Sequence, residues 1–175
     1  TINDNCHALG AKYKKDKKYA CKYADIATQS FHPVKVITTG EGGAVLTNHK
    51  KFFEKINILR SHGIERNNNL KKKFGHWYYQ MNYLGFNYRL SDLQASLGIS
   101  QLKKLSKFIK KRKKLAKIYD LHFKNDPIFT VPHTEKYCDH SYHIYPLKID
   151  FKKLIIDKKK FFQIMLKERI NLQVH

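Results

Sequence analysis

The sequence has little that points to an extracellular or membrane protein. Only three of its 175 residues are cysteines, at positions 6, 21 and 138, and they form no CxxC pair. An odd, scattered set of this kind supplies no disulfide framework and favours a reducing compartment. No apolar run approaches the ~20 residues needed to span a bilayer, and no signal peptide is visible. We therefore expect a cytoplasmic location and no membrane segment.

Arginine is also scarce, although the chain is strongly basic. The net charge is +21, but only five of the 35 basic residues are arginines. The lysines are spread along the whole chain, whereas readers of bases and phosphates concentrate arginine on one element for its bidentate fork. We therefore expect solvated lysine-rich faces and no nucleic-acid partner. Binding of nucleic acid or another polyanion by this surface is a distant alternative.

An initiating methionine is absent as well. Residues 1–4 are typical of the end of a strand, and residues 170–175 are typical of a strand that is cut off. The length suits one domain, or one domain and part of another. We therefore expect the chain to be a segment of a longer protein.

The pattern of apolar residues predicts alternating strands and helices. Strands are expected to end at Asp4 and to cover 23–31, 43–48, 142–150 and 170–174, and helices to cover 49–60, about 91–121 and 158–167. Ser91 is a good N-cap for the long helix, and Asp126-Pro127 breaks the pattern after it. The stretch 65–75 is polar, as in mobile segments. Two strands and a helix after the long helix predict a second, smaller α+β domain.

One lysine differs from the others in its surroundings. Lys35 follows a Phe-His-Pro turn at 31–33 and precedes the β-branched run 36–39, whereas other lysines occur in polar runs such as 71–73 and 158–160. A lysine in a partly desolvated pocket loses some preference for the ammonium form and becomes a usable amine nucleophile. That is the chemistry of a Schiff base. Spacing alone allows an ordinary surface lysine on a loop equally well.

Three polar residues at predicted strand ends and turns are further candidates. Asp4 ends a strand, where α/β sheets place ligand contacts, although a helix N-cap is a common alternative. His7 lies on the same side of the turn that follows, and a lone histidine is often structural. Ser30 has a hydroxyl that suits either a phosphate or the nearby backbone.

Three segments together carry a family resemblance: residues 4–11 (DNCHALGA), 30–43 (SFHPVKVITTGEGG) and 85–92 (GFNYRLSD). They resemble the DegT/DnrJ/StrS family of pyridoxal-phosphate-dependent nucleotide-sugar aminotransferases. The resemblance covers nearly the whole chain, including the turn at 60–64. It implies an α/β protein with the aspartate aminotransferase fold, fold type I. Residues 1–108 would be the C-terminal half of the large domain, and 109–175 the linking helix and an incomplete small domain.

Within the family, the residues His32-Pro33-Val34, the turn at 6–10 and the aromatic run 77–79 look most like one branch, the transaminases of the pseudaminic acid pathway. The resemblance implies transfer of an amino group, from glutamate, to a UDP-linked 4-keto-6-deoxy sugar, with a part in flagellin glycosylation. The alternatives are an enzyme for another 4-keto sugar, of the perosamine or aminoarabinose type, and an inactive fragment. A family dehydratase is disfavoured, because that branch replaces the lysine.

The resemblance also implies how the cofactor is held. Lys35 would form the Schiff base with pyridoxal phosphate and then shuttle the proton, and Asp4 would pair with the protonated pyridine nitrogen. His7, where many members have Gln, would contact the ring's 3-hydroxyl. Ser30 would bind the phosphate. Asn87 would reach the phosphate in the neighbouring subunit's site, which implies a homodimer with composite sites.

The remaining implications concern the substrate and two departures from the family pattern. Gln173 and His175 resemble the start of a loop that faces the sugar nucleotide, and no metal is expected. Asn3 stands where an acidic residue is usual, and Gln29 replaces a usual apolar residue. A polar Gln inside a buried strand has to find partners.

Overall fold

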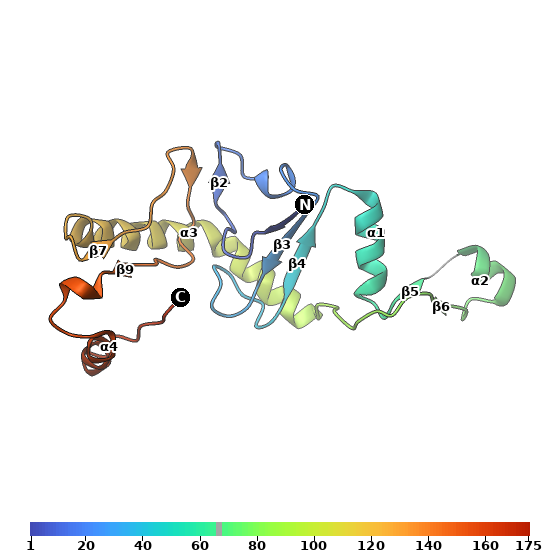
Figure 1. Ribbon diagram of the computed structural model, residues 1–175. Coiled ribbons are helices and arrows are strands. Elements are labelled where there is room, and N and C mark those ends of the chain that lie inside the picture. Colours follow the sequence, from blue (N-terminus) through green and yellow to red (C-terminus); the bar gives the residue numbers. More distant parts are fainter. Residues whose placement is uncertain (66–67) are drawn as a thin grey trace.

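A three-stranded sheet lies at the centre of the computed structural model, which describes residues 1–65 and 68–175 (Figure 1). The strands have the order β1-β3-β4 and are Ile2–Asp4, Ile26–Ser30 and Gly43–Leu46. β1 runs parallel to β3, and β4 runs antiparallel to it. All three lie within segments that the apolar alternation predicts as strands.

Three of the helices are those that the sequence predicts: α1 (Lys50–Leu59), α3 (Asp92–Phe123) and α4 (Lys158–Lys167). Ser91 caps α3 as expected. Its Oγ accepts from Gln94 N at 3.3 Å while Gln94 Oε1 accepts from Ser91 N at 3.0 Å, a reciprocal capping box. α3 continues through residues 108 and 109, so the expected domain boundary falls inside this helix and stays a prediction.

The predicted elements are wrong in two segments near the C-terminus. Residues 170–174 do not form a strand, and the strand expected at 142–150 is reduced to β9 (Lys148–Ile149), which pairs with β7 (Phe129–Thr130). A short apolar run becomes a strand only when a partner strand supplies its hydrogen bonds and a packed face. The run at 170–174 has no such partner among the described residues.

Several short elements were not predicted from the sequence. They are β2 (Lys12–Tyr13) paired with β8 (Cys138–Asp139), β5 (Ile64–Glu65) paired with β6 (Gln80–Met81), α2 (Asn68–Phe74), and the 3-10 turns η1 (Tyr19–Cys21) and η2 (Phe151–Lys153). α2 lies in the polar stretch 65–75, of which residues 66 and 67 lie outside the described part. Two-residue strands are too short to show a periodicity of two.

β5, β6 and α2 form an arm that extends away from the sheet, beyond α1 (Figure 1). Large apolar side chains are exposed on the arm and on the segment that returns from it to α3, among them Trp77, Tyr79, Met81, Leu84 and Tyr88. The whole chain exposes 13927 Å², whereas a compact monomer of this mass exposes about 8,900 Å². The described chain therefore leaves much apolar surface without a cover.

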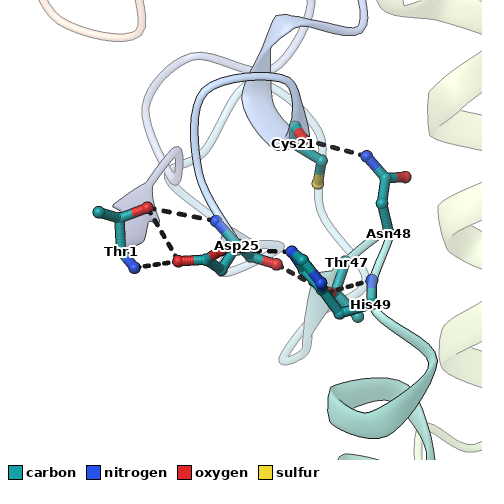
Figure 2. A network of polar contacts seen from close by, with 6 residues as sticks. All are labelled: Thr1, Cys21, Asp25, Thr47, Asn48 and His49. Carbon is teal, nitrogen blue, oxygen red and sulfur yellow. Dashed lines mark hydrogen bonds and ion pairs between the residues drawn. The ribbon is translucent and has the colours of Figure 1, made fainter.

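A polar network fastens β3 and β4 to the start of α1 (Figure 2). Thr47 Oγ1 donates to Asp25 O at 2.6 Å and accepts from His49 N at 3.1 Å. His49 Nε2 lies 3.2 Å from the Asp25 carboxylate, which also accepts from Thr1 Oγ1 at 3.2 Å. Because Asp25 precedes β3, this network lies at the opposite end of the sheet from the C-terminal ends of β1 and β3.

The loop between β3 and β4 carries Lys35 and is closed by its own hydrogen bonds. Lys35 N donates to His32 O at 2.9 Å, which closes the turn around Pro33, and Thr39 N donates to Phe31 O at 3.0 Å. Lys35 itself is half-buried. The residues that follow it and anchor the loop are buried: Val36, Ile37 and Thr39.

Gly98 lets α3 pack closely against this loop. A Cβ at position 98 would lie 2.8 Å from Thr39 Cγ2, and Thr39 is buried. We expect Gly98→Ala to lower the free energy of unfolding by about 1 kcal/mol, because overpacking exceeds the gain in helix propensity. Chemical denaturation of the complete protein measures the change.

Thr39→Ser provides the control for this contact. It removes Cγ2 but keeps the Oγ1 that donates to Glu41 O at 2.7 Å. In the Thr39→Ser background, Gly98→Ala should instead stabilise the protein by about 0.5–1 kcal/mol, the propensity difference alone. Equal destabilisation in both backgrounds would show that the contact with Thr39 does not limit this position.

Candidate active site

The C-terminal ends of β1 and β3 bring Asp4 and Ser30 to one face of the sheet. Asp4 pairs with Thr28 across the two parallel strands, so these side chains share a face, and Ser30 lies two residues further along the same face. In open α/β sheets, ligands bind beyond the carboxyl ends of the strands. The chain after Ser30 leads directly into the Lys35 loop, so this end of the sheet collects three of the candidate residues.

Asp4 is held as a carboxylate by its neighbours. Its Oδ1 accepts from Cys6 N at 3.1 Å, an Asx turn with no helix following it. Hydrogen bonds from the Cys6 thiol and amide, and then the charges of His7 and Lys35, lower the pKa of Asp4, although burial acts in the opposite direction. An exposed, ionised carboxylate therefore stands at the strand end.

The charge of Lys35 acts on the groups around it. Partial burial and then the Lys35 charge lower the pKa of His7, although Asp4 opposes them. Burial, then His7, Lys35, Arg112 and His175, lower the pKa of His143 to about 4. The Lys35 amine is thus within electrostatic reach of Asp4 and of two imidazoles, in a half-buried position.

Three histidines from distant parts of the chain meet at this site. The His7 ring centroid lies 4.3 Å from that of His143, with 56° between the ring planes, and 6.2 Å from that of His175. The structure therefore brings together the predicted residues His7 and His175. His143 was missed, because the sequence offers only a histidine inside an expected strand, with no spacing that links it to position 7.

Ser30 uses its hydroxyl in a local contact. Its Oγ accepts from His32 N at 3.4 Å, the backbone interaction that the sequence left as an alternative to phosphate binding. This bond uses an oxygen lone pair and leaves the O–H proton for a second partner. Both interpretations of Ser30 are therefore compatible with its geometry.

Two of the predicted site residues lie outside this cluster. The backbone of Asn87 pairs with Ser61, after the end of α1, and the side chain of Asn87 is exposed. Gln173 is exposed in the coil that leads to His175. Gln29 points to the face opposite Ser30, and its Oε1 is buried without a hydrogen-bond partner among the described residues. The partner that a buried Gln requires is not found within this part of the chain.

The described residues contain no group of His, Cys, Asp or Glu side chains that could hold a metal ion. No helix in the described part is both long enough and apolar enough to cross a bilayer. Cys6, Cys21 and Cys138 are free, half-buried thiols.

The sequence as a whole matches a family profile. The profile of the DegT/DnrJ/EryC1/StrS aminotransferase family matches residues 1–175. The chain belongs to this family. The family predicted from the three motifs is therefore confirmed.

A relative, the UDP-4-amino-4,6-dideoxy-N-acetyl-beta-L-altrosamine transaminase of Campylobacter jejuni, is 44% identical over 174 residues, which are 99% of this chain and 44% of the relative. The chain thus spans less than half the length of this curated relative.

Solved structures of the family confirm the fold. The putative sugar aminotransferase Spr1654 from Streptococcus pneumoniae, in its PMP form, matches with a TM-score of 0.85 and 26% identity. The match covers 99% of this chain and 44% of the Spr1654 chain. Helicobacter pylori PseC, an aminotransferase involved in the biosynthesis of pseudoaminic acid, has a TM-score of 0.78 and 36% identity over 96% of this chain and 42% of its own. The predicted α/β fold of type I is therefore confirmed.

Proposed function

We propose that the complete protein is a pyridoxal-phosphate-dependent aminotransferase. Its substrate would be a UDP-linked 4-keto-6-deoxy sugar, with glutamate as the amino donor, in pseudaminic acid biosynthesis and so in flagellin glycosylation. The observation that carries the proposal is the half-buried Lys35 within electrostatic reach of the ionised Asp4. The likeness to the C. jejuni and H. pylori proteins supports the pathway. Sugars of the perosamine or aminoarabinose type are the alternative substrates.

The residues at the strand ends fit pyridoxal phosphate. The lowered pKa of Asp4 provides the anion that a protonated pyridine nitrogen requires. The free O–H of Ser30 suits a phosphate oxygen, and Lys35 is the amine that attaches the cofactor. Asp4, His7, Ser30 and Lys35 would hold the cofactor, with His7 at the ring hydroxyl. When bound, the cofactor withdraws electrons from the amino-bearing carbon of the substrate.

The protein's own groups then orient the reactants and move one proton. Asp4 keeps its negative charge at neutral pH, because its pKa lies below the ordinary value of 3.8. Lys35 Nζ would then take up and return the proton of the substrate's amino-bearing carbon. The loop that carries Lys35 is closed by its own hydrogen bonds and anchored by buried residues. It therefore limits how far Lys35 can move and keeps this amine near the reacting atoms.

We also propose a homodimer in which Asn87 completes the neighbouring subunit's phosphate site. Asn87 lies outside the Lys35 cluster, on the segment that returns from the apolar arm, and the exposed residues of the arm include Trp77 and Met81. An exposed apolar surface of this kind is typical of an interface. A cytoplasmic location fits three free thiols. Gln173 and His175 would face the sugar nucleotide.

Borohydride reduction tests the assignment of Lys35. We expect reduction of the complete, cofactor-loaded protein to fix the cofactor on the peptide that contains Lys35, as measured by mass spectrometry. Lys50, whose side chain is 87% exposed on α1, is the matched control and should stay unmodified. Labelling spread over exposed lysines, or none, would contradict the proposal. Turnover of UDP-linked against GDP-linked 4-keto sugars then tests the substrate class.

A groove on α3 favours polyanion binding as a second candidate function. The groove has a volume of about 930 Å³ and is lined by eight lysines: Lys12, Lys17, Lys107, Lys110, Lys111, Lys113, Lys114 and Lys117. Lys12 and Lys113 are paired with Asp139. A high-affinity complex with DNA that weakens steeply with salt would support this candidate. Weak binding that is equal in a variant with these lysines replaced would exclude it.

A further inference from the structure

The segment around His143 is built to hold that residue at the Lys35 site. β8 pairs with β2, which follows the His7 turn, and so ties residues 138–139 to the same side of the molecule as His7. Ser141 is 1% exposed, and its Oγ donates to His7 O at 3.3 Å. The backbone of His7 and the approach to His143 are thus directly bonded to each other.

α3 supplies the remaining anchors of this segment. Arg112 Nη1 donates to Tyr142 O at 3.1 Å and to His143 O at 2.9 Å. Tyr145 Oη donates to Asp120 Oδ1 at 2.6 Å. Tyr142 has a φ of +51°, which a bulky side chain rarely adopts, so the surroundings hold the chain in a strained conformation just before His143. The strain and the anchors together fix where the His143 ring lies.

We propose that His143 is the positioning residue of His7: its ring packs against the His7 ring in a tilted arrangement and holds that ring at the Lys35 site. The ring centroids are 4.3 Å apart. The inference rests on the proposed function for what His7 contacts, the ring hydroxyl of the cofactor. The packing of the two histidines rests on the structure alone.

Burial and most of the charges around the two histidines lower the pKa values of both rings. His143 faces His7, Lys35, Arg112 and His175, and burial and these groups lower its pKa to about 4. His7 faces Lys35, His175 and Asp4; burial, Lys35 and His175 lower its pKa, and Asp4 alone raises it. Both imidazoles are therefore uncharged at neutral pH.

An uncharged His7 is the form that suits its proposed contact. A neutral imidazole has one N–H donor and one acceptor nitrogen, whereas the protonated ring has two donors and a charge. His143 Nδ1 is buried and has no hydrogen-bond partner among the described residues, so this nitrogen does not link His143 to His7, and the two rings meet through packing. The tilted ring contact is thus the means by which His143 acts on His7.

A histidine titration by NMR tests the proposal in the complete protein without added cofactor, in which Lys35 keeps its free amine. Histidine carbons are labelled, and the signals of His7 and His143 are assigned by their loss in His7→Gln and His143→Phe. In the unaltered protein we expect a His7 pKa below 6.5 and a His143 pKa near 4. A His143 that titrates at or above 6.5 would overturn the proposal without any further variant.

Two substitutions show whether a ring at position 143 is enough or whether the imidazole itself is needed. His143→Ala removes the ring contact with His7, so the His7 pKa should rise towards 6.5, whereas His143→Phe keeps a ring there and should leave the His7 pKa low. An unchanged His7 pKa in His143→Ala, or an equal rise in His143→Phe, would overturn the proposal. His133→Ala, which removes an 81% exposed histidine, is the control and should shift nothing.

The outcome is independent of transamination. The titration reads the ionisation of His7, whereas the proposed function is read by cofactor fixed on Lys35. A protein that carries no cofactor on Lys35 but shows the expected His7 shifts would refute the function and keep the histidine pair. The reverse result would keep the function and refute the role of His143.

Discussion

Lys35→Ala is expected to lower kcat for transamination in the complete protein by about 10³-fold or more, because it removes both the attaching amine and the proton carrier. Lys35 is half-buried at the C-terminal ends of β1 and β3, and its charge contributes to the lowered pKa values of Asp4 and His7. Steady-state and single-turnover kinetics with the 4-keto sugar measure the effect. Full transamination by Lys35→Ala would refute the assignment.

Two further variants show which property of Lys35 matters. Lys35→Arg keeps a positive charge in the same loop but supplies no usable amine nucleophile. It should therefore lose about as much activity as Lys35→Ala while keeping the His7 pKa low, whereas Lys35→Ala should raise the His7 pKa. Lys50→Ala removes an exposed lysine of α1 and should leave kcat unchanged. Near-normal activity of Lys35→Arg would mean that charge, and not the amine, is what the site requires.

Local features of the sequence predicted a large part of this arrangement. The Pro33 turn and the buried residues after Lys35 depend on near neighbours, because the hydrogen bonds that close this loop lie within the loop itself. The Ser91 cap is likewise local, because a capping box needs only the residue three positions later. Such features are readable from spacing, since their partners lie a few residues away.

Features that depend on distant partners were not predicted. His143 reaches His7 only through β2–β8 pairing, Arg112 and the buried Ser141, none of which a residue pattern near position 143 reveals. The strand expected at 170–174 failed for the same reason, since its apolar residues found no partner strand in the described chain. Gln29 is the converse case: the sequence showed that it needs a partner, and the described residues supply none.

The role of the Asp4 charge can be separated from its shape. Asp4→Asn keeps a side-chain oxygen for the Cys6 amide, at 3.1 Å in the parent, but removes the negative charge. We expect kcat to fall by about 10²–10³-fold, because a preorganised charge at the reacting group typically contributes this much. Reduction should still fix the cofactor on Lys35, so the loss would appear in the chemical step. Unchanged kcat, or loss of labelling at Lys35, would contradict this role.

The pH dependence gives a second test of Asp4. Because its folded pKa is lowered below the ordinary 3.8, Asp4 loses its charge only as the pH falls through that lower value. Activity of the parent should therefore show no acid limb from Asp4 above pH 3.8. Asp25→Asn is the matched control: this carboxylate lies 3.2 Å from His49 Nε2, at the opposite end of the sheet. It should change stability and leave kcat as in the parent, which would assign the loss in Asp4→Asn to the position of the charge and not to the number of charges on the protein.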